Sequence, residues 1–230
     1  MATSLHRAAK RTRPSQRYTS AEFRPYVTAL GQLTLAWNDM QQSFAELFST
    51  AAARELPRPG DRVDMAYLHL WNSLQSDRHQ RNLLRALLDN PTREWWRPRF
   101  VECAKEATNE ANRLEDRRNN AVHAPLFFQP ASLYGDTTRR EKIAPAEWLQ
   151  HPRALTLAKR GNILTEFREC RDGIISLSDY VRQMNSALAN PNRPWPEIHP
   201  RQSRPSQSSA QVRRTRNPRA RRPPPRSSQA

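Results

Sequence analysis

The sequence predicts an all-α fold, an antiparallel bundle of four to five helices with disordered basic tails. Apolar residues between positions 20 and 193 recur at steps of three and four, the period of one helix face. Prolines and Asn-Pro pairs interrupt this pattern at intervals typical of helix ends. Both ends of the chain lack such apolar stripes, so we place the bundle between residues 20 and 193.

The first helix is expected from about Ser20 to Ala53, with Ser20 as its N-cap and Pro57 beyond its end. Its apolar stripe consists of Leu30, Leu33, Trp37, Met40, Phe44, Leu47 and Phe48. A second helix is expected from about Asp61 to Leu74. Aromatic residues on these stripes are predicted to pack in the core and not to stack on a nucleobase; they are Trp37, Tyr67 and Trp71.

A third helix is expected to begin at Ser76 or Asp77 and to end before Asn90-Pro91. The fourth runs from about Thr92 to His123, with a break expected near Pro98. Residues 124–150 contain three prolines and are predicted to be irregular, with a short extended piece at 126–128. Residues 155–159 fit either a short helix or a strand. The last helix is expected from about Asn162 to Leu188.

Charge divides the chain into three parts: a basic arm (1–19), the helical domain (20–193) and a tail rich in Arg, Pro and Ser (194–230). The arm has five basic and no acidic residues, and the tail has nine arginines and one glutamate. The domain is nearly balanced, although the formal net charge of the whole chain is +16. The tail either attracts nucleic acid through its phosphates or only solubilises the chain. Its clustered arginines are Arg213, Arg214, Arg216, Arg219, Arg221 and Arg222.

The sequence lacks the motifs that define several classes of protein. Neither G-x-G-x-x-G nor the P-loop pattern occurs, and the chain has only 5 glycines. No spacing typical of metal ligands appears, so we expect neither a metal nor another cofactor. The two cysteines, Cys103 and Cys170, are predicted to be buried thiols. No apolar run is long enough to span a membrane, and we expect a cytoplasmic protein.

The end of the fourth predicted helix carries the candidate site, Glu115-Asp116-Arg117-Arg118-Asn119-Asn120-Ala121-Val122-His123. A His can exchange protons near neutral pH, and a forked Arg can hold a phosphate. On a regular helix, Arg118 and His123 point about 140° apart. They could converge if the helix ended between them, or if two copies faced each other. Arg117 is also spaced correctly from His123, so the choice of arginine stays open.

This segment resembles the signature of HEPN-domain proteins, an Arg, then a polar residue that is often Asn, and a His four to six residues after the Arg. The resemblance covers residues 20–190 and implies a helical bundle, often a dimer with both motifs at the interface. Many members of the family are metal-independent endoribonucleases of toxin–antitoxin, phage-defence or RNA-processing systems. Relatives often have Gly after the His, where this chain has Ala124.

The leading functional prediction is a HEPN-like endoribonuclease that leaves 2′,3′-cyclic phosphate ends. Arg118 would bind the phosphate, His123 would be the acid or base and Asn119 would orient one of them, while Glu115 or Asp116 could tune the arginine. Expected partners are RNA, a second copy and an antitoxin or other protein. The alternative is a non-catalytic dimerisation or interaction module with a basic tail. In that case the arginines pair with nearby carboxylates and His123 only caps the helix C-terminus.

Overall fold

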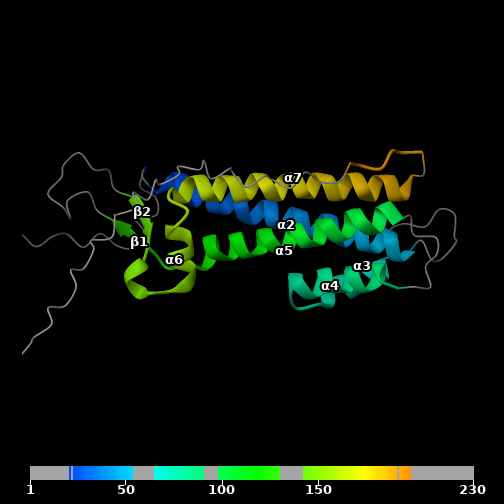
Figure 1. Ribbon diagram of the computed structural model, residues 1–230, viewed down its shortest axis with the longest axis horizontal. Coiled ribbons are helices and arrows are strands. Elements are labelled where there is room, and N and C mark those ends of the chain that lie inside the picture. The colour runs from blue at the N-terminus through cyan, green and yellow to red at the C-terminus, as the bar shows by residue number, and fades with distance from the viewer. Residues whose placement is uncertain are drawn as a thin grey trace, which may run out of the picture. The chain divides into compact units, whose positions relative to one another are not determined.

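The structure is a computed structural model that describes residues 23–53, 65–90, 98–129, 142–190 and 192–197, together with Ala21. These residues form six α-helices, one short 3-10 helix and one two-stranded sheet, which confirms the predicted all-α bundle (Figure 1). In chain order the elements are α2 (Arg24–Ala53), α3 (Met65–Ser73), α4 (Asp77–Leu88), α5 (Pro98–His123), β1 (Leu126–Gln129), β2 (Lys142–Pro145), η2 (Glu147–Leu149), α6 (Pro152–Ala158) and α7 (Ile163–Ala189).

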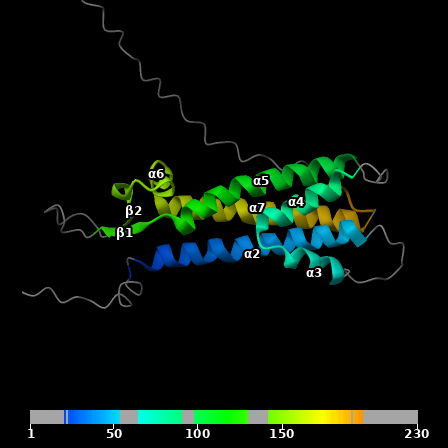
Figure 2. The ribbon, with the colours of Figure 1, turned by 90° about the horizontal axis from the view of Figure 1, so that it is seen from below.

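The two longest helices, α2 and α7, pack side by side and run in the same direction (Figures 1 and 2). Hydrogen bonds give the register: Arg171 donates to Gln32 at 2.6 Å, and Ser178 donates to Asp39 at 3.0 Å further along both helices. Helix α5 lies against α7 and runs in the opposite direction. The predicted antiparallel packing therefore holds between α5 and its long neighbours, whereas α2 and α7 are parallel.

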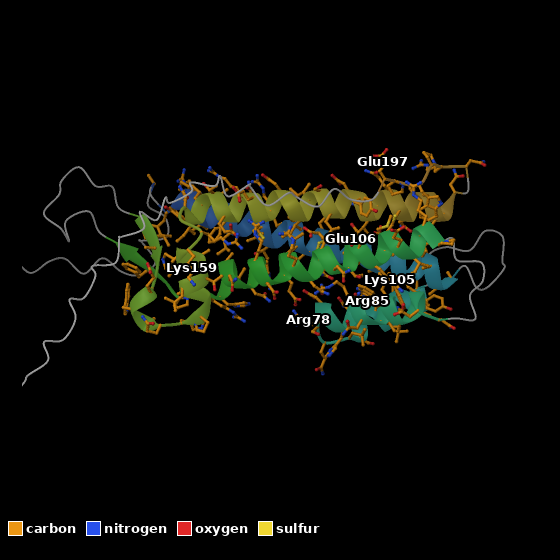
Figure 3. All side chains as sticks on the ribbon, in the orientation of Figure 1. Arg78, Arg85, Lys105, Glu106, Lys159 and Glu197 are labelled. Carbon is orange, nitrogen blue, oxygen red and sulfur yellow. The ribbon has the colours of Figure 1, made fainter. Side chains whose placement is uncertain are left out.

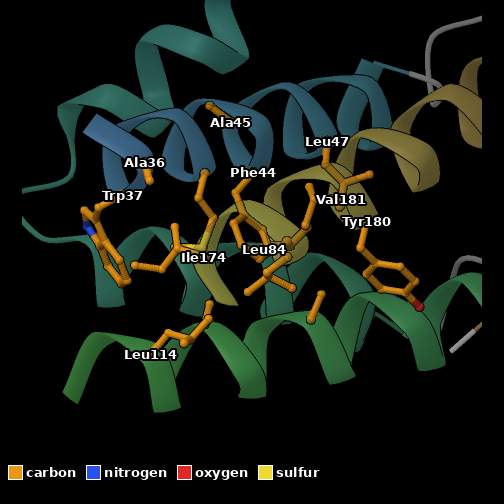
Figure 4. Close-up of a cluster of buried hydrophobic side chains, with 14 of the residues drawn as sticks. Ala36, Trp37, Phe44, Ala45, Leu47, Leu84, Leu114, Ile174, Tyr180 and Val181 are labelled. Carbon is orange, nitrogen blue, oxygen red and sulfur yellow. The ribbon is translucent and has the colours of Figure 1, made fainter. Parts of the chain in front are cut away.

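The interior contains the apolar stripes that the sequence predicts. Trp37, Phe44 and Leu114 are almost completely buried where α2, α5 and α7 meet (Figure 4). Trp71 is buried as predicted, whereas Tyr67 is only partly buried against the core. Cys103 and Cys170 are both fully buried free thiols, as expected. Each fully buried large apolar side chain stabilises the fold by about 1.5–3 kcal/mol, so this core supports a self-contained bundle.

A buried polar link joins α2 to α7 inside this core. The hydroxyl oxygens of Ser43 and Ser178 lie 2.9 Å apart, and both residues are at most 2% exposed. Ser178 donates to the Asp39 carboxylate, so Ser43, whose alternative acceptor is the main-chain oxygen of Asp39, supplies the proton of the link. Because a buried hydroxyl without a partner is costly, this link favours one register of the two helices.

The helix ends follow local sequence signals. Ser76 is the N-cap of α4, and its hydroxyl accepts from the main-chain N–H of His79. Asn162 caps α7 in the same way, accepting from Thr165 at 3.1 Å. Helix α5 begins at Pro98, where the sequence predicted a break. The expected cap Ser20 and the start of the second predicted helix at Asp61 lie outside the described residues.

The irregular region after α5 contains a small antiparallel hairpin. Strand β1 includes the short extended piece expected at residues 126–128, and it pairs with β2 from Leu126 opposite Pro145 to Gln129 opposite Lys142. The segment that fitted either a helix or a strand is a helix, α6. It packs against α5, β2 and η2, so the hairpin, η2 and α6 cluster at the C-terminal end of α5 (Figure 1).

Contact with the bundle extends past residue 193, where the domain was expected to end. The ring of Trp195 lies 5.5 Å from that of Phe100, and Arg99 donates to the main-chain oxygen of Pro196. The basic arm and the tail arginines lie outside the described residues. No helix of the described chain is long and apolar enough to cross a membrane.

Candidate functional site

All residues of the predicted motif lie on the last two turns of α5, which continues without interruption to His123. Five residues of regular helix separate Arg118 from His123 by about 140° around the axis and about 7.5 Å along it. The helix does not end between them, so this route to their convergence is excluded. Within one copy of the chain the two side chains point to different sides of α5.

Arg118 lies on the inner side of α5, facing α2. Its guanidinium carbon is 5.6 Å from the centre of the Trp37 ring, and its Nη1 donates to Asn119 Oδ1 at 3.0 Å. Its Nε is buried without a hydrogen-bond partner. No carboxylate among the described residues forms an ion pair with Arg118. An aromatic ring and an amide thus hold this cation, which keeps its full charge available to an anion.

Trp37 is itself held in place by contacts with α4. Its indole Nε1 donates to Asp77 Oδ2 at 2.7 Å, and it is only 2% exposed. The guanidinium carbon of Arg81 lies 5.8 Å from the centre of the same ring. Two guanidinium groups therefore contact one indole, a relationship that the sequence pattern did not reveal.

Arg81 is completely buried and pairs with Glu115 across α4 and α5. Its Nη2 donates to Glu115 Oε2 at 2.8 Å and its Nε to Asn112 Oδ1 at 2.9 Å, while its Nη1 is buried without a partner. Burial lowers the pKa of Arg81, and the nearby charge of Glu115 opposes this shift. The exposed Arg78, at the start of α4 (Figure 3), also donates to Glu115, at 2.9 Å.

The two carboxylates expected to tune the motif arginine do not contact Arg118. Glu115 is occupied by Arg78 and Arg81, and Asp116 lies 3.7 Å from Arg78. Their ion pairs join α4 to α5. The expected pairing of the motif arginines with Glu110, Glu115 or Asp116 is likewise absent among the described contacts, since Glu110 binds Arg113.

Arg117 has a different environment from Arg118. Its Nε and Nη2 donate to the two oxygens of Glu166 at 2.8 and 3.0 Å, and Glu169 lies 3.5 Å away. Burial alone would lower the pKa of Arg117, but the hydrogen bonds and charge of Glu166 outweigh burial and raise it. Arg117 is thus committed to joining α5 to α7. This leaves Arg118 as the motif arginine without a carboxylate partner among the described residues.

His123 is the last residue of α5, and its side chain is exposed. No hydrogen bond or ion pair to its imidazole occurs within the described part of the chain. Ala124, which follows it, donates to Asn120 at 3.2 Å and continues the helical hydrogen bonding. The φ of Ala124 is not positive, so this turn does not require the glycine that often follows the His in HEPN proteins.

The described residues contain no group of three or more His, Cys, Asp or Glu side chains that could hold a metal ion. No protein-family model, curated protein or solved structure matches the chain. The resemblance to HEPN proteins therefore depends on Arg118, Asn119 and His123 and on the helical layout around them.

Proposed function

We propose that this protein is a HEPN-like, metal-independent endoribonuclease. The observation that carries the proposal is the environment of Arg118, which is held by Trp37 and Asn119 and by no described carboxylate. A guanidinium that only stabilised the fold would be expected to pair with an acid, as Arg117 does with Glu166. On the same helix end, the exposed His123 supplies an imidazole for the role of general acid or base.

In the proposed reaction, an imidazole takes the proton of a ribose 2′-hydroxyl as its oxygen attacks the adjacent phosphorus. The bond to the 5′-oxygen breaks, and this oxygen leaves with a proton from a second acid. Arg118 neutralises the charge that accumulates on the phosphate oxygens, and Asn119 orients the guanidinium. The products are a 2′,3′-cyclic phosphate and a 5′-hydroxyl, and no metal ion takes part.

The proposed site is composite, because one copy keeps Arg118 and His123 on different sides of α5. Two copies related by a two-fold axis near the end of α5 would bring the arginine of one close to the histidine of the other. Such a dimer also supplies two histidines, one for each proton transfer. A toxin or defence role, with an antitoxin or other partner protein, fits this activity.

The proposal is tested by incubating a purified RNA of defined sequence with the wild type, Arg118→Ala and His123→Ala, with and without EDTA. We expect cleavage by the wild type in EDTA, cyclic phosphate ends, and a loss of at least about 100-fold in each variant. Arg78→Ala is the matched control, because it removes an exposed arginine that contacts Glu115 but not Trp37. Equal cleavage by the wild type and His123→Ala would disprove the mechanism.

A non-catalytic interaction module is the second candidate, and the separation of Arg118 from His123 within one copy favours it. In this case the cluster around Trp37 only stabilises the packing of α2, α4 and α5. Analytical ultracentrifugation combined with the cleavage assay separates the two candidates. A wild-type dimer that binds a partner protein and leaves RNA intact supports the module, whereas growth arrest of bacteria that depends on both Arg118 and His123 supports the nuclease.

A further inference from the structure

Two adjacent large apolar side chains project from η2, at the end of the bundle where α5 terminates. Trp148 is 59% exposed and Leu149 is 58% exposed. Of the large apolar side chains described as exposed, Trp148 is the only aromatic one. Each of the other tryptophans whose surroundings are described, Trp37, Trp71 and Trp195, is buried or partly buried against the core. The exposed Trp148 therefore does not gain the stabilisation that burial gives to these three tryptophans.

The indole of Trp148 is nevertheless held in place. Its ring centre lies 4.1 Å from that of Phe127 at an interplanar angle of 72°, an edge-to-face contact with strand β1. The turn that carries it is closed by the main-chain hydrogen bond from Leu149 to Ala146 at 3.1 Å. Gln150 follows in the left-handed region with φ 51°, a conformation that no other non-glycine residue of the described chain adopts. A fixed, exposed indole loses little conformational entropy when it binds a flat ligand.

The segment that carries this indole is joined to the segment that follows His123. The main-chain N–H of Ala146 donates to Pro125 at 2.8 Å, which joins the segment after His123 to the segment before Trp148. His123 is two residues from Pro125, and Trp148 is two residues from Ala146. The Cα atoms of His123 and Trp148 therefore lie within about 20 Å of each other. A short stretch of extended single-stranded RNA can span this distance.

The surroundings of Trp148 are basic. Helix α6, which packs against η2, carries the exposed Arg153 and ends in the turn that contains Lys159 and Arg160, both exposed (Figure 3). Between residues 142 and 162 the only acidic residue is Glu147. This charge complements a polyanion such as the phosphate backbone of a nucleic acid.

We propose that Trp148 is a stacking site for an unpaired base of single-stranded RNA, at the same end of α5 as His123. This inference rests on the proposed function and names the strand form of its substrate. Bases of a duplex are stacked on each other and cannot cover an indole, whereas an unpaired base can. Arg153, Lys159 and Arg160 attract the adjoining phosphates, and Trp148 holds one base so that the strand runs toward His123.

The test measures binding of the full-length protein to an unstructured oligoadenylate, in the His123→Ala background so that the probe is not cleaved. Trp148→Ala is expected to weaken binding about 5- to 150-fold, the range found for one stacked base. Trp148→Phe should restore most of the affinity, because it keeps an aromatic face. Leu149→Ala is the matched control, since it removes an equally exposed neighbour that cannot stack, and it should bind as the parent does.

Probes and salt distinguish stacking from the attraction of the basic tails. Inorganic polyphosphate and a duplex RNA should show no dependence on Trp148. The ratio between the parent and Trp148→Ala should persist from low to high salt, while both affinities fall together. An unchanged affinity of Trp148→Ala for oligoadenylate would overturn the inference. Equal losses in Trp148→Ala and Leu149→Ala, or a shared change in self-association, would overturn it too and assign the patch to a protein partner.

The outcomes also separate this inference from the proposed nuclease. If the wild-type protein leaves RNA intact but the affinity for oligoadenylate depends on Trp148, the stacking site is supported and the proposed nuclease activity is disproved. If RNA is cleaved through Arg118 and His123 with the same kcat/KM in Trp148→Ala, the nuclease stands and the stacking site fails.

Discussion

The guanidinium of Arg118 lies 5.6 Å from the centre of the Trp37 ring, and this contact joins the proposed phosphate-binding group to the core of the bundle. Trp37 is 2% exposed and is fixed by Asp77, so the position of the arginine depends on residues that a substrate does not reach. Activity should therefore respond to substitutions that lie behind the arginine as well as to changes of the arginine itself.

The first prediction concerns Trp37. Trp37→Leu removes an aromatic contact worth about 0.5–2 kcal/mol, so kcat for RNA cleavage should fall about 2- to 30-fold while KM changes little. Trp37→Phe should recover part of this loss because it keeps a ring beneath the guanidinium. Steady-state kinetics with a fluorogenic RNA measures both parameters.

Trp71 provides the matched control for this prediction. It is equally buried, at 1% exposed, but its ring packs against Phe48 at 5.3 Å, and no contact with Arg118 is recorded. Trp71→Leu should lower the free energy of unfolding to a similar extent as Trp37→Leu while leaving kcat unchanged. A parallel loss of kcat in both variants would show that Trp37 acts only through stability.

The second prediction separates the two adjacent arginines. Arg117→Ala leaves the buried carboxylate of Glu166 without its partner and should cost about 3–5 kcal/mol in the free energy of unfolding. Arg118→Ala should cost about 1 kcal/mol and abolish cleavage. Urea titration of each variant, together with the cleavage assay, measures the two effects. Restored stability in an Arg117→Ala, Glu166→Ala double variant would confirm the origin of the first loss.

The third prediction concerns the buried pair of Arg81 and Glu115. Glu115→Gln removes the charge that compensates the completely buried guanidinium and should destabilise the protein by about 3 kcal/mol or more. Adding Arg81→Met should recover much of this loss, because an apolar side chain of similar length needs no partner. A double-mutant cycle in urea measures the coupling. If the losses in the free energy of unfolding of the two single variants simply added in the double variant, the predicted coupling would be contradicted.

The fourth prediction concerns pH. Burial raises the pKa of the Cys170 thiol from an ordinary value of 9.0 to about 12, while Arg117 acts in the opposite direction. Below pH 9 the thiol is protonated in both states, so it causes no pH dependence. Between pH 9 and 12 the unfolded chain releases this proton more readily, and stability should fall by up to about 1.4 kcal/mol per pH unit. Urea titrations of the wild type and Cys170→Ala should diverge in this window, and identical slopes would contradict the prediction.

Local patterns predicted the helices because each helix has its own apolar stripe and its own end signals. Ser76, one of the two residues expected at the start of α4, caps that helix, α7 begins next to Asn162 as expected, and Trp37 is buried as its stripe position requires. The parallel arrangement of α2 and α7 could not be read this way, since direction depends on the intervening connections. Three segments of these connections, 54–64, 91–97 and 130–141, lie outside the described residues.

The contacts of the candidate site were mostly beyond the sequence pattern, because they join residues far apart in the chain. Arg117 is 49 positions from Glu166, and Arg81 is 34 positions from Glu115. One signal was present: Arg81 precedes Leu84 by three positions and Leu88 by seven, which places it on the apolar face of α4. A charged residue in such a position predicts a buried partner.

The hydroxyl link between Ser43 and Ser178 restricts how the bundle can move. Sliding α2 past α7 by one turn would break the contact between the two buried hydroxyls and would take Ser178 away from the Asp39 carboxylate, its acceptor on α2. Sliding of α2 along α7 is therefore disfavoured, and we expect the two helices to move together as one rigid body. A conformational change that admits the proposed substrate would then move α4, α5 or the β1–β2 hairpin relative to the α2–α7 pair.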